Sequence, residues 1–464
     1  MQSLYADRAP VVAGSFYPSN TKELSRELDI LIKDAKSFPK KDVQAIIVPH
    51  AGYVFSANVA ATAYKTLHKK YKNIFIIGSS HHVNFNGVSL FTQGDYITPL
   101  GKVKVNQTLV TELMKKNTFM TYQPEAHTSE HTIEVQLPFL QNIYGDSFQI
   151  VPIIMATSEL DTIRKTADAL QPYFNDENLF IISTDLSHYP SYSDAKVVDM
   201  RLFHAIQTNS TKNFLNAIKE NEKSHIKNLQ TSACGWSSVL TLLNLTKNRA
   251  FSYQLLEYKN SGDSQYGDDE KVVGYGAMRI FPSKEFTLND AEKKTLKEIA
   301  KLALYDAVIK DEKTFINAKR IDAKLKKHLG AFVTLHLHGK LRGCIGRFEP
   351  DAPIYQTIID MSIAASRYDT RFTPVSPKEL KNITIEISLL TPRKKISSID
   401  DIVIGRDGIY VQYGKKNGTY LPQVATDMGW NTQQFVKSCC EDKAGIDPIH
   451  CKDIELYTYK AIVF

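Results

Sequence analysis

Short apolar runs without polar alternation mark the first half of the chain. Residues 45–48, 74–77 and 179–182 are rich in isoleucine, and turn-forming or polar residues follow each run. This pattern is typical of strands buried on both faces of a parallel sheet. Apolar residues recur at helical spacing in residues 21–36, before the first run, and the alanine-rich residues 57–67 between the first two runs also predict a helix. The alternation predicts an α/β unit with a mostly parallel sheet, flanking helices and right-handed crossovers.

Each of these runs leads into histidine. His50 follows the first run, His81 and His82 follow the second, and His188 follows the third. Open α/β sheets bind ligands at the carboxyl ends of their strands. We therefore expect these imidazoles to gather at one edge of the sheet, because packing alone is a poor reason for three strands to end in histidine.

A further candidate region begins at Glu125. Its spacing predicts one amphipathic helix running to about Tyr144, with His131 and Glu134 on the same helical face. Glu130 and Glu134 are simply interpreted as acidic residues favoured near a helix start. His131 is a candidate for a functional role.

Asp185 and Cys234 are two further candidates, one after the third apolar run and one at a predicted helix start. Asp185 precedes His188 by three residues, which suits proton transfer, although a carboxylate in such a turn can also cap backbone N–H groups. Cys234 stands at the start of an apolar helix, where the helix dipole favours the thiolate. A lone cysteine there is also compatible with a small buried apolar side chain.

The second half of the chain has a different pattern. A helix is predicted from Leu288 to Val308, and alternating residues at 331–347 predict a half-exposed strand and hairpin. Strand-like segments follow at 383–390 and 408–413. We divide the chain into a domain at 1–282, a linker at 283–286, and a smaller α+β domain at 287–464.

Composition narrows the class of protein. The net charge of +7 is small for 464 residues, and the lysines are scattered in pairs, so we expect no nucleic-acid partner. The five cysteines are odd in number and show no paired spacing, which predicts no disulfide framework and favours the cytoplasm. We expect no signal peptide and no membrane span, since no apolar run approaches ~18 residues.

Histidines at adjacent strand ends together with a thiolate predict a divalent-metal site. These ligands suit iron, zinc or copper and disfavour magnesium or calcium. An alternative without metal is a nucleophilic Cys234 paired with His188 and oriented by Asp185.

Two groups of segments resemble known families. The segments at 47–53, 78–82, 130–139, 183–188 and 233–235 resemble the Memo family. The segment 341–346, with Arg342 and Cys344, and the segment 366–374 resemble the AMMECR family. The fusion is similar to the AmmeMemoRadiSam system, which implies a radical S-adenosylmethionine protein as partner. The Memo segments span nearly all of residues 1–282.

The resemblance implies a site and a fold. Memo proteins are similar in fold to class III extradiol dioxygenases, which hold iron through two histidines and a glutamate. The implied metal ligands are His50, His81 and Cys234, so a thiolate replaces the dioxygenase carboxylate and ring cleavage is only an analogy of fold. Catalytic or supporting roles fall on Asp185, His188 and His131.

A wider set of residues is expected to line pockets. Neighbouring residues in an extended segment point to opposite sides, so we assign His81 as the ligand and His82 to the pocket. Arginines in the second domain offer bidentate donors for an anion, although glycines that permit a tight backbone with Cys344 buried explain that motif equally well. The pocket candidates are His82, Tyr53, Arg342, Cys344, Arg367 and Arg371.

We interpret the chain as a metal-dependent redox enzyme, with iron favoured and copper or zinc as alternatives, acting on a small-molecule substrate. A second interpretation is a binding or adaptor module that keeps a metal or thiol pocket without turnover. A third is a zinc-dependent hydrolase.

Overall fold

The computed structural model describes residues 6–247, 249–283, 286–348 and 351–464. The chain divides into two compact units, residues 1–284 and 285–464, which are considered separately here. The linker expected at 283–286 includes residues 284 and 285, which lie outside the described residues. No helix in the described ranges is both long and apolar enough to cross a bilayer.

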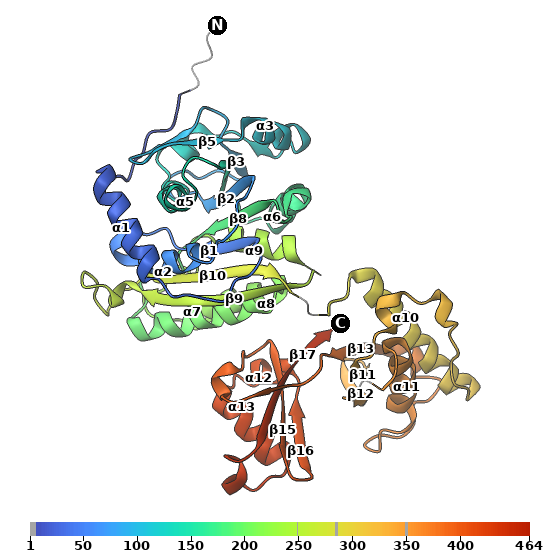
Figure 1. The fold of residues 1–464 in the computed structure, drawn as a ribbon. Coiled ribbons are helices and arrows are strands. Elements are labelled where there is room, and N and C mark those ends of the chain that lie inside the picture. Colours follow the sequence, from blue (N-terminus) through green and yellow to red (C-terminus); the bar gives the residue numbers. More distant parts are fainter. Residues whose placement is uncertain (1–5, 248, 284–285, 349–350) are drawn as a thin grey trace. The chain divides into compact units, whose positions relative to one another are not determined.

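The first unit is built on a ten-stranded sheet (Figure 1). Its centre is parallel, in the order β5-β7-β2-β8-β1, and antiparallel strands close both sides. This confirms the predicted α/β class. The strands are β1 (Ala45–Val48), β2 (Asn73–Ser79), β3 (Val88–Leu90), β4 (Tyr96–Thr98), β5 (Gly101–Val105), β6 (Met120–Thr121), β7 (Gln149–Met155), β8 (Asn178–Ser183), β9 (Phe251–Asn260) and β10 (Gly274–Pro282).

Helices cover this sheet in two groups. Helices α1, α2 and α5 pack against one another, whereas α9 packs on α6, α8, β2 and β8. Their bounds are α1 (Thr21–Asp34), α2 (Tyr53–Tyr64), α3 (Gln107–Lys116), α4 (Pro124–Thr128), α5 (Leu137–Tyr144), α6 (Leu160–Leu170), α7 (Tyr192–Gln207), α8 (Thr211–Lys223) and α9 (Trp236–Thr246).

The single helix predicted from Glu125 to Tyr144 is wrong. The segment forms α4, then an irregular stretch, a short 3-10 turn (Glu134–Gln136) and α5. Pro138 has no N–H to continue a helix through this point, and the carboxylate of Glu130 accepts from the backbone N–H groups of His131 and Thr132. His131 therefore lies in a loop and shares no helical face with Glu134.

The second unit contains a seven-stranded antiparallel sheet in the order β12-β11-β13-β17-β15-β16, with β14 paired to β17. The long strand β17 joins its two halves, because one end pairs with β13 and the other with β15. The strands are β11 (Gly330–Leu337), β12 (Lys340–Arg347), β13 (Ile383–Leu390), β14 (Lys394–Ile396), β15 (Asp407–Tyr413), β16 (Lys416–Tyr420) and β17 (Glu455–Val463).

Helices cover each half of this second sheet. The helix α11 packs on β11 and β12 and also contacts α10, whereas α12 and α13 belong with the half around β15. The helices are α10 (Asp290–Tyr305), α11 (Ile354–Arg367), α12 (Pro422–Asp427) and α13 (Thr432–Ser438). Cys440 and Cys451 form a disulfide in this half. The expectation of unpaired cysteines is therefore wrong for these two, because chain folding brings them together without a recognisable spacing.

Two phenylalanines on neighbouring strands stack in the core of the first unit. Phe180 on β8 stacks on Phe75 of β2, with ring centroids 4.5 Å apart, and both are fully buried. We expect Phe180→Ala to lower the free energy of unfolding of this unit by about 3–5 kcal/mol, because it removes apolar contact and leaves a cavity. The measurement is denaturant unfolding followed by tryptophan fluorescence.

The chain has two tryptophans. A Trp430→Phe background therefore leaves Trp236 as the reporter of the first unit. Val197→Ala is the matched control, because that side chain is 55% exposed. A loss for Phe180→Ala no larger than the control's would contradict the prediction.

Candidate metal centre

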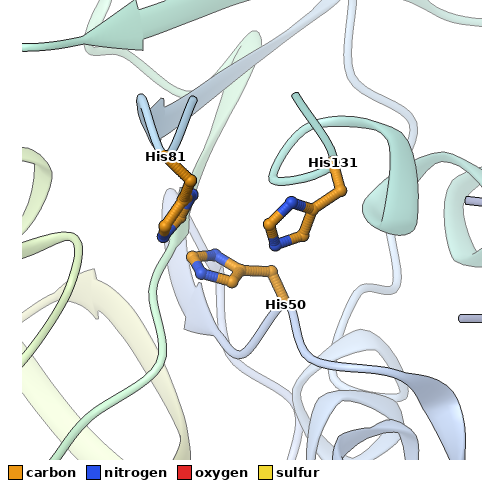
Figure 2. A group of neighbouring side chains, drawn as sticks. All are labelled: His50, His81 and His131. Carbon is orange, nitrogen blue, oxygen red and sulfur yellow. The ribbon is translucent and has the colours of Figure 1, made fainter. Parts of the chain in front are cut away.

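Three imidazoles converge at the carboxyl edge of the parallel sheet. His50 follows β1 and His81 follows β2, while His131 enters from the loop before α5 (Figure 2). The ring centroids are 5.0 to 5.3 Å apart, and one ligand atom from each residue lies within 4.8 Å of the others. The side chain of His50 is 2% exposed, whereas that of His81 is 28% exposed, so the group opens toward solvent on the His81 side.

A serine hydroxyl orients His50. Ser183, at the end of β8, donates its hydroxyl proton to the carbonyl of Thr132 at 2.7 Å. That oxygen lies 3.1 Å from Nδ1 of His50 and can only accept there, because its one proton is already used. Nδ1 of His50 is therefore the donor to Ser183, and Nε2 of the same ring faces Cys234.

A single carboxylate, Glu130, holds the other two histidines. It accepts from the backbone N–H of His81 at 2.6 Å and lies 3.1 Å from Nδ1 of the same residue. It also lies 3.3 Å from Nδ1 of His131. Burial favours the neutral acid, but the hydrogen bond and charge of His81 outweigh it and lower the pKa of Glu130 to about 2. The interpretation of Glu130 as a helix cap is wrong, because no helix begins there; its oxygens face the two imidazoles and the backbone N–H groups of the loop.

The thiol of Cys234 completes this cluster. Its Sγ lies 3.2 Å from Nε2 of His50 and accepts from the backbone N–H of Asp185 at 3.3 Å. Burial opposes ionisation, but the charge and hydrogen bond of His50, with a hydrogen bond from His81, lower the pKa of Cys234 to about 6. The residue precedes α9 by two positions. The cluster thus offers a thiolate at neutral pH.

His81 and His131 titrate in opposite directions. Burial opposes protonation of His81, yet hydrogen bonds with Cys234 and Glu130 raise its pKa to about 10. Burial and the charge of His50 lower the pKa of His131 to about 3, despite the nearby Glu130. At neutral pH the cluster therefore contains a neutral imidazole beside a protonated imidazole and a thiolate.

Asp185 and His188 lie on the same loop after β8, but only Asp185 contacts His50. Asp185 accepts from the backbone N–H of His50 at 2.8 Å, and its other oxygen lies 3.9 Å from Nε2 of that ring. Burial raises the pKa of Asp185. Nδ1 of His188 lies 2.8 Å from the carbonyl of Leu186. The imidazole beside Cys234 is thus His50, whereas the thiol pairing considered from sequence was with His188.

The remaining candidates of the first unit lie around this cluster. His82 is exposed, and its ring centroid is 6.2 Å from that of His131. Tyr53 is buried, and its hydroxyl donates to the carbonyl of Val135 at 2.8 Å. This hydrogen bond holds the backbone that follows His131.

Two glycines let the loops approach this closely. A Cβ on Gly78 would lie 2.3 Å from Oγ1 of Thr132, and one on Gly235 would lie 2.6 Å from Cβ of Thr184. Any larger residue would push apart the segments that carry the histidines and the thiol.

The arginines proposed for an anion site in the second unit are engaged with acidic residues. Arg342 pairs with Glu379 at 2.7 Å, Arg371 with Asp369 at 2.7 Å, and Arg367 with Asp311 at 2.8 Å. Asp369 also accepts from the backbone N–H of Cys344, whose sulfur lies 3.2 Å from Oγ1 of Thr334. These contacts tie strands and loops of the unit together.

Sequence reasoning missed Ser183 beside His50, Gln136 beside Ser183, Arg8 beside the loop of His131, and the contacts of Glu130 with two histidines. Gln136 donates from Nε2 to Ser183 at 2.9 Å. For Glu130, its position directly before His131 was an available signal. The other three are recognisable only from contacts between distant segments.

Each of the two units matches a known protein family. Residues 8–279 match the family model described as Memo-like protein, and residues 298–464 match the one described as AMMECR1. A MEMO1 family protein of Thermoplasma acidophilum is 33% identical over 276 residues, covering 58% of this chain and 97% of the relative. One from Methanopyrus kandleri is 32% identical over 286 residues, covering 59% and 98%. The crystal structure of an uncharacterized protein of Pyrococcus horikoshii is 31% identical and covers 38% of this chain and 91% of that one, with a TM-score of 0.35.

The lowered pKa of Cys234 predicts an unusual alkylation profile in metal-free protein. Because the thiolate is the nucleophile, its reaction with iodoacetamide should rise with pH through a midpoint near 6. An unperturbed thiol would give a midpoint near ~8.5. Replacing His50 by alanine should move the midpoint upward, since it removes the largest favourable interaction of the thiolate.

Mass spectrometry of the modified peptide is the measurement. A Cys344→Ser background removes the other partly exposed free thiol, because Cys439 is buried. A midpoint above about pH 8 in the protein with His50 intact would overturn the prediction.

Proposed function

Because this chain belongs to the Memo-like protein family, with an AMMECR1 domain at residues 298–464, we propose that its histidine cluster is the metal centre of an enzyme. His50, His81 and His131 hold one divalent transition-metal ion, and the thiolate of Cys234 serves as a fourth donor beside His50 and His81. The ligands implied by the family resemblance, His50, His81 and Cys234, are thus joined by His131.

One observation carries the proposal. All three imidazoles place Nδ1 against an oxygen, which is the hydroxyl of Ser183 for His50 and the carboxylate of Glu130 for the other two. Metal-binding histidines characteristically use one ring nitrogen for such a partner, which fixes the ring and leaves the other nitrogen for the metal. A histidine cluster serving only to pack the core has no need for this common orientation.

The donor chemistry selects the kind of metal. Imidazole nitrogens with one thiolate suit iron, copper or zinc and disfavour magnesium and calcium, which prefer oxygen ligands. We favour iron, in keeping with the resemblance to extradiol dioxygenases, and propose redox chemistry on a small-molecule substrate with a radical S-adenosylmethionine protein as partner. Iron bound here would supply one-electron chemistry and an open position for a substrate or a small gas.

Residues beside the metal ligands would handle protons. The pKa of Asp185 is raised by burial, so this carboxyl can hold a proton more readily than a surface aspartate. Its contact with the backbone N–H of His50 also fixes the strand end that presents the ring. We assign the proton-transfer role to Asp185, with His188 next to it on the same loop.

Metal content is the direct test. Protein purified without oxygen should contain about one iron, copper or zinc ion per chain. His50→Ala and His81→Ala should each lose it, because both residues belong to every ligand set considered. Elemental analysis of the purified proteins is the measurement.

Further variants define the ligand set. His131→Ala and Cys234→Ser should each weaken binding, and the cobalt-loaded Cys234→Ser protein should lose the sulfur-to-cobalt charge-transfer band. His68→Ala is the control, because His68 is an exposed histidine of the same unit. Less than about a tenth of a metal per chain, unchanged by His81→Ala, would rule out the metal centre.

A second candidate function rests on the contact between Cys234 and His50. The distance of 3.2 Å and the lowered pKa of the thiol suit a nucleophilic thiolate without metal. In that case chelator-treated protein should release an initial burst of product from an activated ester, and Cys234→Ser should abolish it. A burst that requires added metal, or survives in Cys234→Ser, would exclude this candidate.

A further inference from the structure

The segment at residues 8–17, here called the lead, contacts the loop that carries Glu130 and His131. Arg8 in this lead is 6% exposed and pairs with Tyr96 through an isolated β-bridge. Its guanidinium also lies over the ring of Tyr96, 5.0 Å from the centroid. A buried arginine needs a strong set of partners, because an unpaired buried charge is very costly.

All three branches of the Arg8 guanidinium are used. Nε donates to the carbonyl of His127 at 2.7 Å, Nη2 donates to the carbonyl of Glu130, and Nη1 pairs with the carboxylate of Glu134 at 2.6 Å. These acceptors stand before, within and after the segment that presents His131. One rigid planar group therefore fixes both ends and the middle of that segment.

Glu134 fastens the lead from the other side. Its carboxylate is fully buried and accepts from the backbone N–H groups of Val11 and Val12 at 2.9 and 3.0 Å. It also accepts from the hydroxyl of Tyr17 at 2.7 Å. The ion pair of Arg8 and Glu134 thus joins the lead to the loop. Both side chains are buried, so water does not compete for these hydrogen bonds.

The other half of the cluster does not depend on these contacts. His50 and Asp185 stand at the ends of the adjacent parallel strands β1 and β8, and Cys234 is held by the backbone N–H of Asp185. The loop bearing Glu130 and His131 has no regular secondary structure between residues 129 and 131. Its position relative to the strand ends must therefore come from side-chain contacts.

We infer that Arg8 and Glu134 are positioning residues of the proposed metal centre. They set the position of Glu130 and His131 against His50 and Cys234 without touching a metal or substrate themselves. The inference rests on the proposed metal function, and it assigns the lead at residues 8–17 to the assembly of the site.

The test compares Arg8→Lys with Arg279→Lys in the full chain. Lysine keeps the charge but cannot reach three acceptors with one planar group. Arg279 is the matched control, because it is 1% exposed and bonded to Gln254 and the carbonyl of Pro39. We expect Arg8→Lys to weaken cobalt(II) affinity by about 10–100-fold and to alter the cobalt absorption spectrum, with Arg279→Lys within about twofold of the unmodified chain.

A second readout needs no metal. Amide hydrogen exchange in residues 127–136 should be faster in Arg8→Lys and unchanged in Arg279→Lys, while exchange in β2 stays the same in both. If circular dichroism shows that Arg8→Lys does not fold, Glu134→Gln replaces it, because this change keeps the side-chain size while removing the charge that faces Arg8.

The outcomes separate the two proposals. Tight cobalt binding by the unmodified chain and by Arg8→Lys alike, with the same spectrum, would overturn the positioning role and leave the metal centre intact. An unmodified chain that binds no cobalt would overturn the metal centre. In that event faster exchange at 127–136 would still support the positioning of this loop by Arg8, and unchanged exchange would refute it.

Discussion

The buried carboxylate of Glu130 is the contact on which the histidine cluster depends. It is 3% exposed, and it accepts from the backbone N–H groups of His81, His131 and Thr132 while facing two imidazoles. Removing a carboxylate from water is costly unless donors surround it. Because those donors come from two segments far apart in the chain, satisfying this one charge joins the end of β2 to the loop before α5.

The electrostatics of the cluster follow from this arrangement. His81 lies between two anionic groups, Glu130 and Cys234, so its pKa rises to about 10. His131 is buried among other imidazoles, so its pKa falls to about 3. A divalent cation entering the cluster would compete with a proton on His81 and would find a neutral imidazole and a thiolate already in place.

In the second unit, the charged residues form ion pairs with one another instead of surrounding a histidine cluster. Arg342, Arg367 and Arg371 each face a carboxylate of their own unit, so their charges are balanced internally. The hydrogen bond of Arg371 holds the pKa of Asp369 well below its usual range. The motif that suggested an anion site thus contributes ion pairs within this unit.

By itself the sequence determined the α/β class, the parallel strands and the presence of His50 and His81 at one sheet edge, since local periodicity defines strands and parallel strands end together. Only the tertiary structure decided that Glu130 breaks the predicted helix, that Cys440 bonds to Cys451, and that Arg8 reaches the loop of His131. These outcomes depend on contacts between residues that only the completed fold brings together, and a local pattern carries no information about such distances.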